Sequence, residues 1–300
     1  MAGLVAVSPA QTLYKYRGLD GEWNYSDRPP PDDRLVEVRE LERAAPPGKL
    51  NVSYSFENQR VRLIASNEYY IPLELKLRIE QISGLEFPDA EDQLHWVVPA
   101  RSERVLIDLG LLENGEPPFL EYGVEFHPGD PRAEHRPEVP YRVPFAVATH
   151  FPVTQAYPDV VTHMSPDSYH AVDMAMPIGT DVFAARGGVV FDVASGNFTA
   201  GLDPERDGPK ANVVQILHDD GTYAVYAHLN TNTVRVRPGD RVERGQYIAD
   251  SGNTGFSSGP HLHFAILRNA GMRTESVPVV FEGANEELVM PATGMSLTAY

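Results

Sequence analysis

The stretch that most limits the possible fold of this chain covers residues 251–266 and reads S-G-N-T-G-F-S-S-G-P-H-L-H-F-A-I. Its first half is rich in glycine, and its second half alternates polar and apolar side chains. The alternation predicts a β-strand with His261 and His263 on one face and Leu262 and Phe264 on the other. Two adjacent imidazoles suit a metal-dependent hydrolase, because one ring can hold the ion while the other handles a proton. A strand that carries two half-exposed histidines by chance is the alternative.

The composition favours β-structure and excludes some kinds of partner and metal ligand. Among 300 residues, 26 prolines and 24 glycines favour short strands and turns over long helices, and the length suggests two domains. A formal net charge of −17 argues against nucleic acid as a partner. Because the chain has no cysteine, any metal must be held by His, Asp, Glu or water. No apolar run is long enough for a transmembrane helix.

The first 147 residues are expected to form accessory units. Residues 1–10 end in small residues and are interpreted as the remnant of a secretory signal, or else as a loose N-terminus. Residues 11–47 predict a short aromatic hairpin around an Asp-Gly turn, followed by a linker. Residues 48–147 predict an accessory antiparallel β-sandwich of the immunoglobulin-like kind, since Ile71 to Ile79 are apolar at every second position with charged residues between them.

Residues 148–283 are expected to form a second β-domain that contains the catalytic residues. Residues 284–300 are expected to form a polar tail that lies on the surface or is disordered. Asp173 lies in an apolar strand, where an unpaired carboxylate is costly and therefore needs a cation or a ring of donors. A hairpin around an Asp-Asp-Gly turn is expected to place Tyr226 and His228 on one face of the return strand.

Four motifs in this part occur in a characteristic order: V-D-M-A-M-P-x-G-T, Y-A-H-L, V-R-P-G-D-x-V-x-x-G-Q and G-x-T-G-x-S-x-G-P-H-L-H-F. Over about 120–130 residues the chain resembles the lysostaphin-like (LytM-type) zinc metallopeptidases. The resemblance implies a compact antiparallel β-fold and one Zn²⁺ ion. It also implies hydrolysis of the peptide cross-links of peptidoglycan. The expected partners are peptidoglycan peptide stems. The expected protein is a monomer, secreted to the periplasm or envelope of a Gram-negative bacterium.

The same resemblance implies the roles of individual residues. Asp173 and His263 match zinc ligands, and His228 and His261 match the catalytic histidines. We further expect Tyr226 and Asn212 to bind substrate. Residues 197–211 look like an insertion between two strands, and they form either a wall of the substrate groove or a solvated loop.

The remaining zinc ligand is open to three interpretations. The common family pattern H-x-G-V-D has histidine where this chain has Tyr169. His170 is three residues before Asp173, so on a strand the two would face opposite ways. The chain also resembles a branch of the family with a more distant histidine, which His163 fits. We therefore expect His163 as the ligand, with His170 or no third ligand as alternatives. With no third ligand the domain would be a degenerate binding or activator module that regulates another cell-wall hydrolase.

Overall fold

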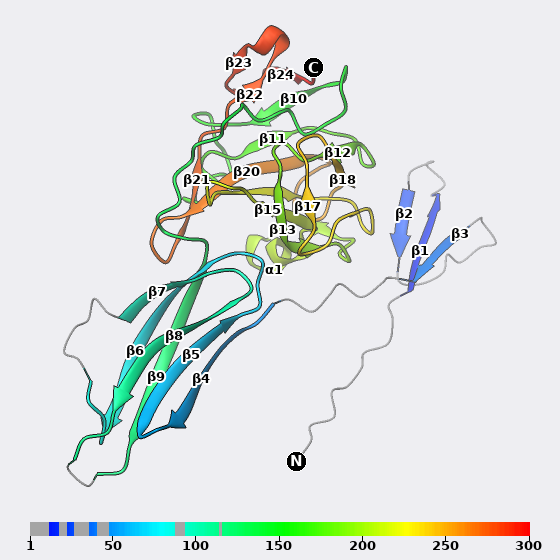
Figure 1. Ribbon diagram of the computed structural model, residues 1–300. Coiled ribbons are helices and arrows are strands. Elements are labelled where there is room, and N and C mark those ends of the chain that lie inside the picture. The colour runs from blue at the N-terminus through cyan, green and yellow to red at the C-terminus, as the bar shows by residue number, and fades with distance from the viewer. Residues whose placement is uncertain (1–11, 18–22, 27–35, 41–47, 88–93, 114–115) are drawn as a thin grey trace.

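A computed structural model describes residues 12–17, 23–26, 36–40, 48–87, 94–113 and 116–300. This part of the chain is mostly β-strand and contains one short α-helix, α1 (Pro204–Asp207) (Figure 1). The described residues are therefore mostly β, as the predicted class requires. Among the described helices, none has the length and apolar character needed to cross a membrane.

The predicted hairpin near the N-terminus is present. β1 (Thr12–Arg17) pairs antiparallel with β2 (Trp23–Ser26). A further strand, β3 (Val36–Glu40), pairs with the other edge of β1 and has no counterpart in the sequence interpretation. The Asp-Gly turn and residues 1–10 lie outside the described residues.

Two small antiparallel sheets occupy most of residues 50–128. Their strand orders are β4-β5-β8 and β7-β6-β9. Both sheets contribute to one buried cluster, which includes Leu63 and Ala65 of β5, Leu75 and Leu77 of β6, and Leu106 of β8. The two sheets therefore pack face to face, while the immunoglobulin-like topology stays a prediction. The strands are β4 (Leu50–Glu57), β5 (Arg60–Asn67), β6 (Leu73–Ser83), β7 (His95–Val98), β8 (Ser102–Gly110) and β9 (Phe119–Pro128).

The second half of the chain is built on a nine-stranded sheet with the order β17-β13-β15-β16-β20-β11-β10-β24, and β21 pairs with β20. One face of the central strands carries the main core, in which Tyr226, Leu262 and Phe264 are fully buried. The strands are β10 (His150–Gln155), β11 (Val172–Met174), β13 (Gly188–Ala194), β15 (Val213–Leu217), β16 (Tyr223–Ala227), β17 (Arg241–Val242), β20 (Leu262–Asn269), β21 (Thr274–Val277) and β24 (Ser296–Thr298). A separate pair joins β12 (Asp181–Phe183) to β18 (Tyr247–Asp250).

The opposite face of this sheet meets the N-terminal sheets. Ile71 and Leu73 share a buried cluster with Ala265 and Leu267 of β20. Glu74, expected on the polar face of its strand, is instead buried at this junction. Its carboxylate accepts hydrogen bonds from Asn269 Nδ2 (2.9 Å) and from the backbone N–H of Met272 (2.6 Å).

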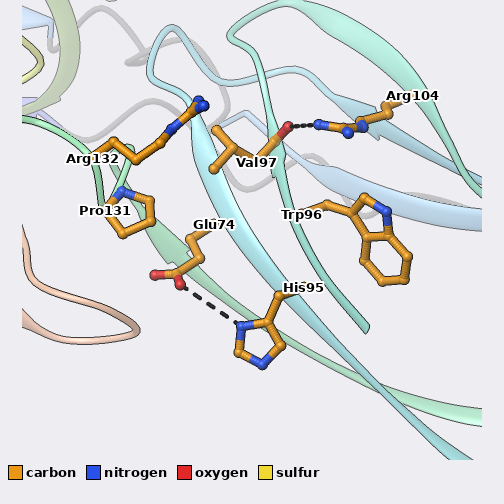
Figure 2. A pocket seen from close by; sticks show the side chains of 7 residues that line it. All are labelled: Glu74, His95, Trp96, Val97, Arg104, Pro131 and Arg132. Atoms are coloured by element: carbon orange, nitrogen blue, oxygen red, sulfur yellow. Dashed lines mark hydrogen bonds and ion pairs between the residues drawn. The ribbon is translucent and has the colours of Figure 1, made fainter. Parts of the chain in front are cut away.

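A small pocket of about 280 Å³ lies beside Glu74. Figure 2 shows the carboxylate of Glu74 pointing toward His95, whose Nδ1 is 4.0 Å away. The pocket is lined by Glu74, His95, Trp96, Val97, Arg104, Pro131 and Arg132.

Residues 284–300 are not a surface tail, so that expectation was wrong. β22 (Phe281–Glu282) pairs with β23 (Leu288–Val289), and β24 pairs with β10 at the edge of the large sheet. Leu297 and Ala299 are 2% and 3% exposed and belong to the main core. Two apolar residues at alternate positions are too short a pattern to identify a strand, and the pairing partner is remote in sequence.

Residues 197–211 are ordered and attached to the glycine-rich loop. β14 (Ala200–Gly201) pairs with β19 (Gly255–Phe256) in parallel, an exception to the antiparallel pairing expected here. Gly255 has φ of +82°, and a Cβ atom there would lie 2.6 Å from the Cβ of Ala211. Glycine is therefore required where the two segments touch.

Candidate metal centre

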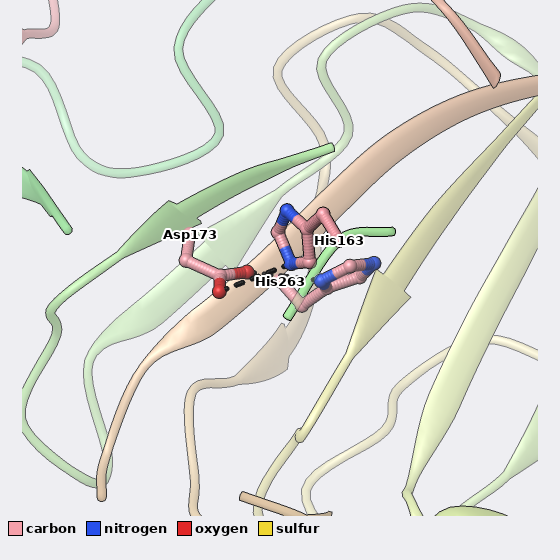
Figure 3. A group of neighbouring side chains, drawn as sticks. All are labelled: His163, Asp173 and His263. Atoms are coloured by element: carbon pink, nitrogen blue, oxygen red, sulfur yellow. Dashed lines mark hydrogen bonds and ion pairs between the residues drawn. The ribbon is translucent and has the colours of Figure 1, made fainter. Parts of the chain in front are cut away.

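Three side chains with metal-ligating atoms meet on the face of the sheet opposite the main core. His163, Asp173 and His263 each offer one atom within 4.8 Å of the others (Figure 3). His163 Nε2 is 3.2 Å from Asp173 Oδ2, and His263 Nδ1 is 2.9 Å from Asp173 Oδ1. A tetrahedral zinc ion with ordinary bond lengths separates its ligand atoms by about 3.3 Å. The spacing therefore fits such an ion and leaves one position for water or substrate.

Strand pairing places two of these side chains. Asp173 of β11 and His263 of β20 are direct partners across an antiparallel ladder, so their side chains leave the sheet on the same side. Their chain neighbours Val172 and Leu262 point into the main core. The predicted alternation is present along β20, with Leu262 and Phe264 in the core and His263 facing the site, while His261 lies just before the strand.

The histidine that joins this pair is His163. It comes from the irregular segment between β10 and β11 and is only 4% exposed. His170, the alternative, lies elsewhere: its Nδ1 is 3.1 Å from the carbonyl oxygen of Ser276, and its ring packs against Tyr157 and Tyr169. The structure thus brings His163 to the site and leaves His170 apart from it.

Asp173 is held in its charged form by its neighbours. Burial alone would raise the pKa of this carboxyl, but hydrogen bonds from His163 and His263 outweigh burial and hold the pKa well below its usual range. Gln155 Nε2 also donates to Asp173 Oδ2 at 3.0 Å. Sequence reasoning missed Gln155. Its spacing of two residues from Val153 suggests only a place in a strand and says nothing about a contact with Asp173.

Two further imidazoles complete the site. The rings of His228 and His261 lie 4.5 Å apart, and the ring of His228 lies 5.8 Å from that of His263. His228 Nδ1 contacts the carbonyl oxygen of Thr254 (2.7 Å), and His261 Nδ1 contacts that of Gly259 (2.8 Å). A carbonyl oxygen only accepts hydrogen bonds, so in both rings Nδ1 carries the proton and Nε2 keeps its lone pair.

The protonation of His228 suits a proton acceptor. Burial, followed by the nearby His263 and His261, lowers the pKa of His228 to about 3. The ring is therefore neutral near neutral pH. His261 lies closer to the ligand group, with Nε2 3.8 Å from Asp173 Oδ1.

Tyr226 does not face the groove, contrary to expectation. It is fully buried, and its hydroxyl oxygen accepts a hydrogen bond from the backbone N–H of Ala185 at 2.7 Å. The alternation that would pair it with His228 is broken, since His228 has a left-handed backbone with φ of +60°. This turn sends the imidazole to the site while Tyr226 stays in the core.

Asn212 is likewise structural, contrary to its expected role in substrate binding. It is fully buried, its Oδ1 accepts from the N–H of Asn197 (2.9 Å), and its Nδ2 donates to the carbonyl oxygens of Asn197 (2.7 Å) and Leu229 (3.1 Å). Asn212 therefore ties residues 197–211 to the segment that follows His228.

Part of the chain is similar in sequence to known endopeptidases. The chain is 35% identical over 104 residues to glycyl-glycine endopeptidase ALE-1 of Staphylococcus capitis, covering 34% of this chain and 25% of that protein. It is 28% identical over 237 residues to peptidoglycan DD-endopeptidase ShyB of Vibrio cholerae, covering 73% of this chain and 50% of that protein. The chain thus spans between a quarter and a half of these relatives.

Among solved structures, the catalytic domain of a mutant of the prophage-encoded M23 protein EnpA from Enterococcus faecalis is 30% identical, with a TM-score of 0.32, covering 42% of this chain and 87% of that one. The model of peptidase family M23 matches residues 167–275. This match contains Asp173, His228, His261 and His263. Residues 167–275 therefore form a domain of peptidase family M23.

Proposed function

We propose that this protein is a zinc-dependent endopeptidase that hydrolyses peptide cross-links in bacterial peptidoglycan. The observation that carries the proposal is the arrangement of His163, Asp173 and His263 beside two imidazoles whose Nδ1 atoms are held by backbone carbonyls. The substrate class comes from the relatives, which are named as a peptidoglycan DD-endopeptidase and a glycyl-glycine endopeptidase. Its partners are then the peptide stems of the cell wall.

The residues present fit one zinc ion. Two imidazole nitrogens and one carboxylate form a donor set that zinc accepts in catalytic sites. We assign His163 Nε2, an oxygen of Asp173 and His263 Nδ1 as the ligands. When bound, zinc polarises the carbonyl of the scissile bond and makes a coordinated water more acidic.

His228 and His261 handle the proton. A neutral Nε2 accepts the proton of the attacking water, and the imidazolium that results can donate it to the departing amine or to the developing oxyanion. The carbonyls of Thr254 and Gly259 hold both rings with Nε2 directed away from the backbone. Neither ring needs to be charged before the reaction begins.

The groove is bounded by two accessory segments in this proposal. β20 carries His263 toward the site, and Ala265 and Leu267 on the same face pack with Ile71 and Leu73 in one buried cluster. The sandwich of residues 48–147 thus limits one end of the groove. The ordered segment 197–211, attached to the loop at Gly255, forms a wall.

We further propose the organisation and location that the sequence suggested. Residues 11–47 are a hairpin module with a linker, and residues 148–283 are the peptidase domain, to which residues 284–300 add edge strands. We propose that the protein acts outside the cytoplasm, in the periplasm or envelope of a Gram-negative bacterium. We propose that it acts as a monomer.

Metal analysis tests the proposal. The unmutated protein should contain one equivalent of zinc, His163→Ala should lose it, and His170→Ala should keep it. The unmutated protein should also release peptide-linked products from peptidoglycan fragments. Protein that takes up no zinc after supplementation would refute the enzymatic proposal and leave the binding-module alternative.

A further inference from the structure

Gln155 links Asp173 to the segment that carries His163. Strand pairing does not hold these two metal-site residues together. It lies at the end of β10, opposite Asp173 of β11, just past an irregularity in the ladder after Val153. Such an irregularity re-aims the side chain that follows it. Gln155 is 6% exposed and points to the site.

The carboxamide of Gln155 makes contacts in two directions. Its Oε1 accepts hydrogen bonds from the backbone N–H groups of Val161 and Thr162, the latter at 2.6 Å. Its Nε2 donates to Asp173 Oδ2 (3.0 Å) and to Thr162 Oγ1 (2.9 Å). Because backbone N–H groups can only donate, they fix which end of the amide faces them, and the NH₂ group must then face the carboxylate.

The segment that carries His163 has few other anchors. Val161 is 80% exposed and Met164 is 72% exposed, so packing holds little of it, although His163 between them is buried. Asp173 Oδ2, the oxygen that Gln155 holds, is also the one that His163 Nε2 approaches at 3.2 Å. A ring of contacts therefore runs from Asp173 through Gln155 and Thr162 to His163.

We propose that Gln155 is a positioning residue of the metal site, which fixes His163 and Asp173 relative to each other before the ion binds. The inference rests on the proposed function in so far as the ion is zinc. Outer partners of this kind change metal affinity by about tenfold to a hundredfold when removed. Without the amide of Gln155, residues 161–164 would become ordered only when the ion binds. The free energy of ordering them would then lower the affinity for the ion.

The test uses Gln155→Met, which keeps the size and removes every hydrogen bond, and Gln155→Asn, which keeps an amide too short to reach both sides. Gln215→Met is the matched control, because Gln215 Nε2 donates to Asp192 Oδ2 at 2.9 Å across β13 and β15 of the same sheet. Zinc affinity of the full chain, measured by competition with a chelator, should fall about tenfold to a hundredfold in both Gln155 variants. It should be unchanged in Gln215→Met.

A second measurement does not depend on the metal. In the zinc-free full chain, the amide hydrogens of Val161 and Thr162 should exchange faster in Gln155→Met than in the unmutated protein or in Gln215→Met. Unchanged zinc affinity in both Gln155 variants would overturn the inference while leaving the proposed function intact. An unmutated protein without zinc would refute the proposed function, and amide exchange would still decide whether Gln155 anchors the segment. Should Gln155→Met fail to fold, Gln155→Asn carries both measurements.

Discussion

Each imidazole of the site has a ring nitrogen engaged, and the partner of that nitrogen separates the two groups. His163 and His263 turn a ring nitrogen to Asp173, whereas His228 and His261 use Nδ1 on backbone carbonyls. We therefore expect His228→Ala and His261→Ala to keep their zinc but to lose about 10²–10⁴-fold in peptidoglycan hydrolysis. Metal analysis beside a rate assay checks this, with the exposed His150→Ala as control. Loss of zinc in His228→Ala would instead make that residue a ligand.

A buried histidine away from the site should set part of the acid sensitivity of the fold. Burial lowers the pKa of His218 to about 4, and its Nδ1 donates to the carbonyl oxygen of Gly187 at 2.9 Å. Between about pH 6.5 and 4 the unfolded chain binds a proton that the folded chain does not, so the free energy of unfolding falls as the pH falls. The contribution of this residue reaches about 3 kcal/mol at the acid end.

His218→Asn keeps a donor for Gly187 and removes the titration. We expect urea unfolding of the chelator-treated variant to show a smaller loss of stability from pH 6.5 to 4 than the unmutated protein. Equal losses in the two proteins would show that His218 does not contribute.

At the scale of elements, β24 is an edge strand that stabilises the part of the sheet next to the metal site. β24 pairs with β10, and β10 pairs with β11, the strand that contains Asp173. Leu297→Asp would bury an unpaired charge and should lower the free energy of unfolding by more than about 3 kcal/mol. Ser296→Asp, on the exposed face of the same strand, should have little effect. Urea denaturation measures both, and similar losses would mean that strand pairing, rather than burial of Leu297, stabilises this edge.

At the scale of the whole molecule, Glu74 joins the two halves. It is buried and accepts hydrogen bonds from Asn269 and Met272 at the turn between β20 and β21. Glu74→Ala removes the acceptor of the Met272 N–H and one of two acceptors of Asn269 Nδ2, which keeps the carbonyl oxygen of Gly129, and should cost about 2–3 kcal/mol. Lys76→Ala, exposed two residues further along β6, is the control. Calorimetry should show the N-terminal sheets melting earlier in Glu74→Ala; a single unshifted transition would exclude this role.

The parts of the site that the sequence predicts are those set by local alternation. Asp173 and His263 each lie between apolar residues in a strand, so their shared face follows from period two. Tyr226 was misplaced because a left-handed residue at His228 interrupts the alternation, and only backbone geometry reveals it. Gln155 and β24 were missed because their partners are distant in sequence: Gln155 contacts Asp173 in another strand, and Leu297 pairs with Phe151.

The order of strands in the large sheet has a consequence for how the protein is made. β10 is bordered by β11 on one side and by β24 on the other, and Asp173 meets His263 only after 90 further residues have joined the chain. Pairings between segments so far apart form late, because the loop between them must close first. During synthesis the emerging chain therefore carries separated ligands and no assembled metal site. The site can hold a metal ion only once the sheet is nearly complete, so metal binding follows the folding of this domain and cannot guide its first steps.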